Sequence, residues 1–198
     1  MTNLAAYYAL LPMQSETAEI ARGLRRRDPE LLDRLIEQYQ HRLFRYLLHL
    51  TGDRALAEDI FQETWLRVLE RGRQYDGAHS FVSWLLRVAR NLTIDSLRRL
   101  RPASLDALAD PQDESAPFEP ADRRATPFEE LAAGETRDHM VALLASLPTA
   151  YREVLVLRFQ EEMPLEEIAG VLNTPLGTVK SRLYRAMELM REKLEKRS

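Results

Sequence analysis

The stretch LEEIAGVLNTPLGTVKSRLYRA, residues 165–186, decides the fold of the C-terminal part of the chain. Ile168 and Leu172 stand four residues apart and predict the buried side of one short helix. Asn173 follows, and asparagine tolerates the left-handed backbone that ends a helix. Val179 then begins the apolar side of a second helix. Two helices joined by so short a turn predict a helix-turn-helix, whose second helix can enter the major groove of DNA.

Polar side chains fall on the outer side of this second helix once Val179 and Leu183 face inward. Lysine and arginine donate to guanine edges or phosphates, serine donates to phosphate, and an aromatic ring packs on a sugar or a thymine methyl. The first turn of the helix exposes backbone amides that suit a phosphate. The predicted DNA contacts are Gly177, Thr178, Lys180, Ser181, Arg182, Tyr184 and Arg185. The alternative is an amphipathic hairpin whose basic face is only solvated.

Helical signals recur on both sides of the middle of the chain, and no segment has the alternating pattern of a strand. Asp28-Pro29-Glu30 supplies a cap, a proline at the first helical position and an acid in the first turn. Asp53 and Ser80 can cap two further helices. The predicted helices run from Pro29 to Gly52, from Asp53 to Gly72, from Ser80 to Leu100, from Leu147 to Phe159, from Leu165 to Leu172 and from Pro175 to Lys196. The predicted fold class is all-α, with two small helical domains.

An acidic segment rich in proline divides the chain. Five of the ten prolines in the chain fall between residues 102 and 127, where they prevent a long helix. The net charge is +4 over residues 21–100, −6 over 101–135 and +1 over 136–198. The predicted organisation is an N-terminal extension over 1–20, a domain over 21–100, a flexible linker over 101–135 and a domain over 136–198.

Composition excludes several kinds of catalytic and cofactor chemistry. The 198 residues contain no cysteine, which removes disulfides and thiolate metal sites and suits a reducing compartment. The four histidines lack metal-ligand spacing, and no glycine-rich phosphate loop occurs. The longest apolar stretch, Leu4 to Met13, is too short to cross a bilayer. We therefore expect a cytoplasmic protein that is not an enzyme, with no metal, no cofactor and no membrane insertion.

Basic and aromatic residues share one side of the helix that follows Ser80. Trp84, Arg87, Asn91 and Arg98 recur at steps of three, four and seven, beside a predicted core side of Phe81, Leu85, Val88 and Leu92. Rings on which bases stack and cations that hold the backbone are what a single-stranded nucleic acid needs. The alternative is that Trp84 completes the core and the arginines are solvated.

The helix before it carries acceptors around a leucine. Asp59, Gln62, Glu63 and Leu66 lie opposite its predicted apolar stripe, which includes Val68 and Leu69. This face suits a basic, partly apolar protein partner, and a solvated acidic face is the alternative.

In combination, these motifs resemble the extracytoplasmic-function, or group four, sigma factors of the sigma-seventy superfamily. The resemblance covers about residues 21–194. The segment 52–65 is similar to the core-binding helix of region two, 81–99 to the promoter-melting segment, and 147–185 to region four. The order of the three motifs and the linker between them match as well.

The resemblance implies a partner for each surface. It implies that the clamp helices of the largest subunit of core RNA polymerase bind Asp59, Gln62, Glu63, Leu66 and Leu69. It implies that the minus-ten promoter element binds Phe81, Trp84, Arg87, Arg90, Asn91 and Arg98. The minus-thirty-five element is implied to bind the helix-turn-helix contacts named above. Further implied partners are the flap of the second-largest subunit and an anti-sigma factor, and the acidic linker is implied to thread toward the polymerase active centre.

Two other functions remain open at this point. One is a sigma-mimicking protein that captures an anti-sigma factor without touching DNA, and Trp84, Asn91, Lys180 and Arg185 speak against it because a mimic has no use for them. The other is an ordinary dimeric helix-turn-helix repressor, which the motifs of the first domain disfavour. The role of residues 1–20 is unassigned.

Overall fold

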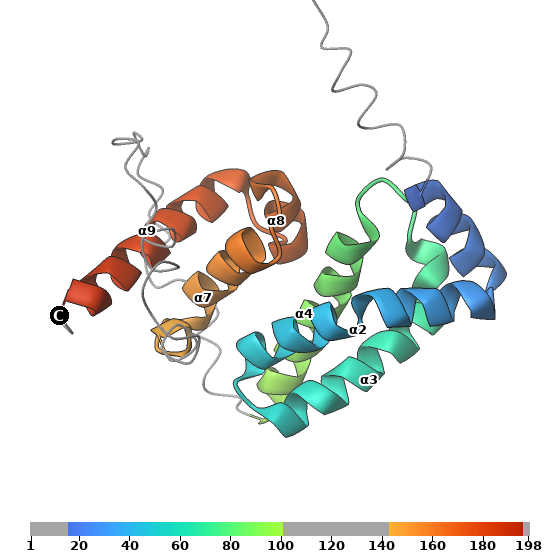
Figure 1. Ribbon diagram of the computed structural model, residues 1–198, viewed down its shortest axis with the longest axis horizontal. Coiled ribbons are helices and arrows are strands. Elements are labelled where there is room, and N and C mark those ends of the chain that lie inside the picture. Colours follow the sequence, from blue (N-terminus) through green and yellow to red (C-terminus); the bar gives the residue numbers. More distant parts are fainter. Residues whose placement is uncertain (1–15, 101–142, 196–198) are drawn as a thin grey trace, which may run out of the picture. The chain divides into compact units, whose positions relative to one another are not determined.

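The computed structural model describes residues 16–100 and 143–195, and all regular structure in these ranges is helical (Figure 1). The predicted all-α class is therefore confirmed. The chain divides into two compact units, Met1–Asp95 and Ser96–Ser198. The predicted linker and residues 1–15 lie outside the described residues, and the domain boundaries stay predictions.

The first unit contains a helix over residues 16–26, then α2 (Pro29–Thr51), α3 (Arg54–Arg71), a 3-10 turn (Gly72–Gln74) and the larger part of α4 (Phe81–Leu100), which runs past the unit boundary. α2 and α3 pack against each other as a hairpin (Figure 1). The first of these helices begins inside the predicted N-terminal extension, and it buries Ile20, Ala21 and Leu24.

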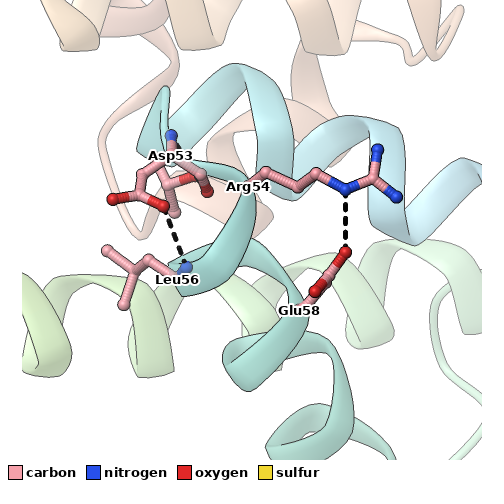
Figure 2. A network of polar contacts seen from close by, with 5 residues as sticks. Asp53, Arg54, Leu56 and Glu58 are labelled. Carbon is pink, nitrogen blue, oxygen red and sulfur yellow. Dashed lines mark hydrogen bonds and ion pairs between the residues drawn. The ribbon is translucent and has the colours of Figure 1, made fainter.

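Local hydrogen bonds explain where the helices begin and end. The carboxylate of Asp28 accepts from the amides of Glu30 and Leu31, and Gly52 ends α2 in the left-handed conformation at φ 66°. Asp53 accepts from the amide of Leu56 at 3.2 Å at the start of α3 (Figure 2). The Oγ of Ser80 accepts from the amide of Ser83 at 3.3 Å at the start of α4. All three predicted caps are confirmed.

An aromatic cluster fills the core where α4 begins. The ring of Trp84 lies 5.5 Å from that of Tyr75 and 5.8 Å from that of Phe81, and the Tyr39 ring lies 5.4 Å from Phe81. Trp84 is only 7% exposed and Phe81 only 2%. The expectation that Trp84 lies on an outer face with Arg87 is therefore wrong, because its indole packs against Tyr75 and Phe81 within this cluster.

Two apolar stripes also differ from those expected. On α4, Leu86 and Ala89 are fully buried, whereas Val88 and Leu92 are only partly so. On α3, Leu69 is 45% exposed and does not belong to the core. Spacings of three and four residues fit neighbouring stripes equally well, and the packing partner decides between them.

The burial of Tyr75 makes the stability of the first unit depend on pH in the alkaline range. Its hydroxyl donates to the carbonyl oxygen of His79 at 2.7 Å, and burial raises the pKa of Tyr75 well above its ordinary value of 10.0. Above about pH 10 the unfolded chain loses a proton that the folded chain keeps, so stability falls with rising pH by at most about 1.4 kcal/mol per unit. Urea unfolding from about pH 8 to 11 measures the slope. Tyr75→Phe should flatten it, and an equal slope in both proteins would contradict the assignment.

The second unit contains α7 (Thr149–Leu155), a π-helical turn (Val156–Gln160), α8 (Leu165–Leu172) and α9 (Leu176–Glu195). α9 packs against both α7 and α8. The helix predicted from Leu147 begins instead at Thr149, because Pro148 is extended and precedes the first helical residue. After Leu155 the chain continues as the π-helical turn over Val156–Gln160. In this turn the amide of Glu161 donates to the carbonyl oxygen of Val156 at 3.0 Å.

The turn of the predicted helix-turn-helix is confirmed. Asn173 ends α8 in the left-handed conformation at φ 51° and ψ 49°. Ile168 and Val171 from α8 and Val179 from α9 are buried at the contact of the two helices. The same inward positions fix which side of α9 faces outward.

Candidate nucleic-acid and polymerase interfaces

The outer side of α9 exposes the side chains that the sequence assigns to DNA. Lys180, Ser181 and Arg185 are exposed, and Tyr184 is 38% exposed. Thr178 and Arg182 are half-buried, and a Cβ placed on Gly177 would meet no atom within 4 Å. The structure therefore gathers all seven predicted contacts on or beside one open helical face.

Neighbouring groups hold some of these side chains. The hydroxyl of Ser181 donates to the carbonyl oxygen of Thr178 at 3.0 Å. Arg185 forms an ion pair with Glu188, and this hydrogen bond raises the pKa of the Arg185 guanidinium. The buried Nε of Arg182 has no hydrogen-bond partner within the described ranges. A phosphate or base on α9 would thus meet one arginine that an acid already engages.

Glu188→Gln is expected to tighten binding of α9 to duplex DNA about two- to fivefold, since an exposed ion pair of this kind is worth only about 0.2–1 kcal/mol. The change frees Arg185 and removes a negative charge that repels phosphate. Titration of a labelled minus-thirty-five duplex measures the affinity. Glu192→Gln, one turn further along α9, removes the same charge but leaves the hydrogen bond between Arg185 and Glu188 in place. An equal gain in both variants would show that overall charge, not release of Arg185, is responsible.

α4 brings cations but not its aromatic ring to the surface. Arg87, Asn91 and Arg98 are exposed, and Arg90 is half-buried with a partner of its own. Phe81 and Trp84 lie in the core. The predicted minus-ten surface is therefore an exposed basic and amide-bearing strip above a buried aromatic cluster.

α3 presents an apolar pair within a polar border. Leu66 is 54% exposed and Leu69 is 45% exposed, one helical turn apart. Asp59 and Gln62 are exposed beside them, and Glu63 is half-buried. Large exposed leucines bordered by acceptors fit a protein partner better than they fit water.

Arg67 is a member of this border that the sequence argument missed. Its guanidinium donates to Glu63 at 2.6 Å and lies 3.9 Å from Glu70, and the hydrogen bond to Glu63 raises the pKa of Arg67. The spacing of four residues between Glu63 and Arg67 is the signal that could have identified the pair. The charge of Glu63, one of the acids predicted to bind the polymerase, is thus already partly balanced by Arg67 in the free chain.

Other kinds of site were sought in the same ranges. Residues 16–100 and 143–195 hold no group of three or more histidines, aspartates or glutamates that could bind a metal ion. No helix in the described parts is long and apolar enough to cross a membrane.

Comparison with known proteins assigns the chain to a family. Residues 35–102 match the sigma-70 region 2 family and residues 138–190 match sigma-70 region 4. The ECF RNA polymerase sigma factor SigW of Bacillus subtilis is 31% identical over 169 residues, which cover 84% of this chain and 90% of SigW. The RNA polymerase sigma-H factor of Pseudomonas aeruginosa is 29% identical over 188 residues, covering 92% and 95% of the two chains.

Solved structures share the fold. CnrH, in its complex with the cytosolic domain of CnrY, has a TM-score of 0.62 at 21% identity and covers 93% of this chain and 98% of its own. RpoE of Bartonella quintana, in its complex with the anti-sigma factor NepR, has a TM-score of 0.62 at 18% identity, with 82% and 96% covered. Both family regions and the relatives together lead to one conclusion: the chain belongs to the extracytoplasmic-function group of the sigma-70 family of RNA polymerase sigma factors.

Proposed function

We propose that this chain directs core RNA polymerase to promoters through three separate surfaces. The observation that carries the proposal is that the two family regions, 35–102 and 138–190, contain the three exposed faces on α3, α4 and α9. Each face has a composition that fits a different ligand.

On α3, Leu66 and Leu69 with their acidic border would receive the basic, partly apolar clamp helices of the largest polymerase subunit. On α4, Arg87, Asn91 and Arg98 would hold the strand of the minus-ten element that leaves the duplex. Extruding a base costs a few kcal/mol of stacking, which contacts to the separated strand must offset. The contribution of Trp84 and Phe81 to that site remains a prediction.

On α9, Lys180, Ser181, Arg182, Tyr184 and Arg185 would contact the minus-thirty-five element as duplex. Exposed arginine and lysine on a helix-turn-helix suit both guanine edges and phosphates. The exposure of Lys180, Ser181 and Arg185 supports this role, because ligand oxygens can reach their donor groups.

The proposal gives the chemistry of RNA synthesis to the polymerase and none of it to this chain, which acts as an initiation factor without a cofactor. Its place of action is then the cytoplasm, where core polymerase works. The solved relatives CnrH and RpoE are bound to CnrY and to the anti-sigma factor NepR. By analogy, we include an anti-sigma factor of the same kind and the polymerase flap among the proposed partners.

Run-off transcription with purified sigma-free core polymerase tests the proposal. We expect initiation at discrete start sites that depend on this chain. Gel shifts separate the alternatives, because a dimeric repressor binds duplex without polymerase and a sigma mimic binds no DNA even with it. No start site on any fragment of the source genome would contradict the proposal.

A further inference from the structure

A second group of cations lies at the opposite end of the first unit from the start of α3. Arg22, Arg25, Arg26 and Arg27 end the helix over residues 16–26, and Arg71 and Arg73 stand on either side of Gly72 at the end of α3. A Cβ on Gly72 would lie 3.1 Å from the Cβ of Leu24, so the side chain of Leu24 packs against the backbone at Gly72. This contact brings the ends of two arginine-rich segments, which are far apart in the sequence, side by side. We call the group the Leu24–Gly72 arginine patch.

Within the described part of the chain, these arginines are exposed cations without a carboxylate partner. All six are exposed, and none makes a side-chain hydrogen bond or ion pair to another residue of the described ranges. Two nearby acids are otherwise engaged, since Asp28 accepts two backbone amides and Glu70 lies 3.9 Å from Arg67. Elsewhere in this unit, Arg54 and Arg67 do have carboxylate partners.

Helix dipoles explain only a small part of the charge. Two helices end at the patch, and each C-terminus carries about half a negative elementary charge. Together they balance about one arginine. The remaining arginine charges have no ion-pair partner within residues 16–100, and an excess of positive charge attracts an anionic partner.

Arg27 supplies an independent observation. Its φ is 55°, its amide donates to the carbonyl oxygen of Leu24, and the amide of Asp28 donates to that of Gly23. This is the Schellman arrangement, whose left-handed position is ordinarily glycine because a side chain there is strained. An arginine kept where glycine fits better suggests that its guanidinium is used for something other than folding.

We propose that the Leu24–Gly72 arginine patch binds the phosphate backbone of promoter DNA, as a contact additional to those on α4 and α9. Guanidinium groups bind phosphates bidentately, and several of them on one surface neutralise adjacent phosphates. The inference rests on the proposed function, because the DNA is the promoter held by the polymerase complex.

The test measures promoter binding by the full chain with core polymerase over a range of salt concentrations. Arg71→Gln is expected to weaken binding about fivefold at physiological salt and to lower the slope of log K against log salt by about 0.7–0.9. Arg191→Gln is the matched control. It removes the same charge from an exposed position on α9, beyond the DNA contacts predicted on that helix, and should leave both values nearly as in the wild type.

Arg27→Gly separates folding from binding, because the two effects have opposite signs. The melting temperature should rise by a few degrees as strain is removed, while promoter affinity and salt slope fall. The proposal would be overturned if the salt slope were unchanged in both Arg27→Gly and Arg71→Gln, with the melting temperature raised in Arg27→Gly alone.

Two probes identify which phosphates are bound. A weakening confined to a fully duplex promoter indicates duplex phosphates, and a weakening confined to a forked probe with one free strand indicates single-stranded phosphates. Failure of the proposed function would look different, because wild-type chain with core polymerase would form no promoter complex. The same variants on duplex DNA without polymerase would then still decide whether the patch binds phosphate.

Discussion

Leu66→Asp is expected to lower the affinity for core RNA polymerase by roughly 30- to 1000-fold, which corresponds to about 2–4 kcal/mol for removal of an interface hot spot. Leu66 is 54% exposed in the free chain, so its side chain contributes little to the core of the first unit. At an interface the same side chain would be desolvated. An aspartate would then be buried beside Glu63 without a cation of its own, which adds a penalty to the missing apolar packing.

Co-purification with core polymerase and a competition assay measure this effect. Ala78→Asp introduces the same charge at an exposed loop position and should bind core polymerase as the wild type does. The free energy of unfolding of Leu66→Asp should stay within about 0.5 kcal/mol of the wild type, as for surface changes generally. Undiminished association of a folded Leu66→Asp protein would refute the assignment of α3 to the polymerase.

Features that depend on contacts within a few residues could be predicted from the sequence. Asp28, Asp53 and Ser80 each satisfy amides two or three residues ahead, and Asn173 ends its helix by its own backbone preference. Their positions therefore needed no knowledge of the rest of the fold. The same holds for the outer face of α9, because Val179 and the residues a turn away from it determine which side is buried.

Features that depend on distant partners could not be predicted in this way. Trp84 fits the spacing of an outer strip as well as that of the core, and Tyr75, from the segment before α4, decides the matter by packing against its indole. Leu69 has the spacing of the core stripe of α3 but remains 45% exposed. The arginine patch depends on the approach of Gly72 to Leu24, across 48 positions of sequence. On a helix that carries apolar residues on several sides, tertiary neighbours thus decide which residues are buried, and the spacing of residues in the sequence does not reveal those neighbours.

The double variant Lys180→Ala with Arg185→Ala is expected to weaken binding to the minus-thirty-five element by about 30-fold or more, because each good base contact is worth about 1–3 kcal/mol and two are lost. Both side chains are exposed on α9, so the fold of the second unit should be unaffected. Association with core polymerase through α3 should be retained. The double variant Arg191→Ala with Lys193→Ala removes the same charge further along α9 and should bind DNA nearly as the wild type does.

The way in which binding weakens reports what the two side chains touch. If Lys180 and Arg185 donate to base edges, the variant no longer discriminates between the native minus-thirty-five sequence and its single-base substitutions, while the salt slope changes little. If they bind phosphates, affinity falls equally on every sequence and the slope drops by about 1 for each phosphate that is no longer neutralised. Arg185 starts from an ion pair with Glu188 and must exchange one anion for another, so its net contribution should be the smaller of the two. Lys180 and Arg185 are both exposed cations on the outer face of α9. If the double variant has the same footprint and affinity as the wild type, the assignment of α9 to DNA is contradicted.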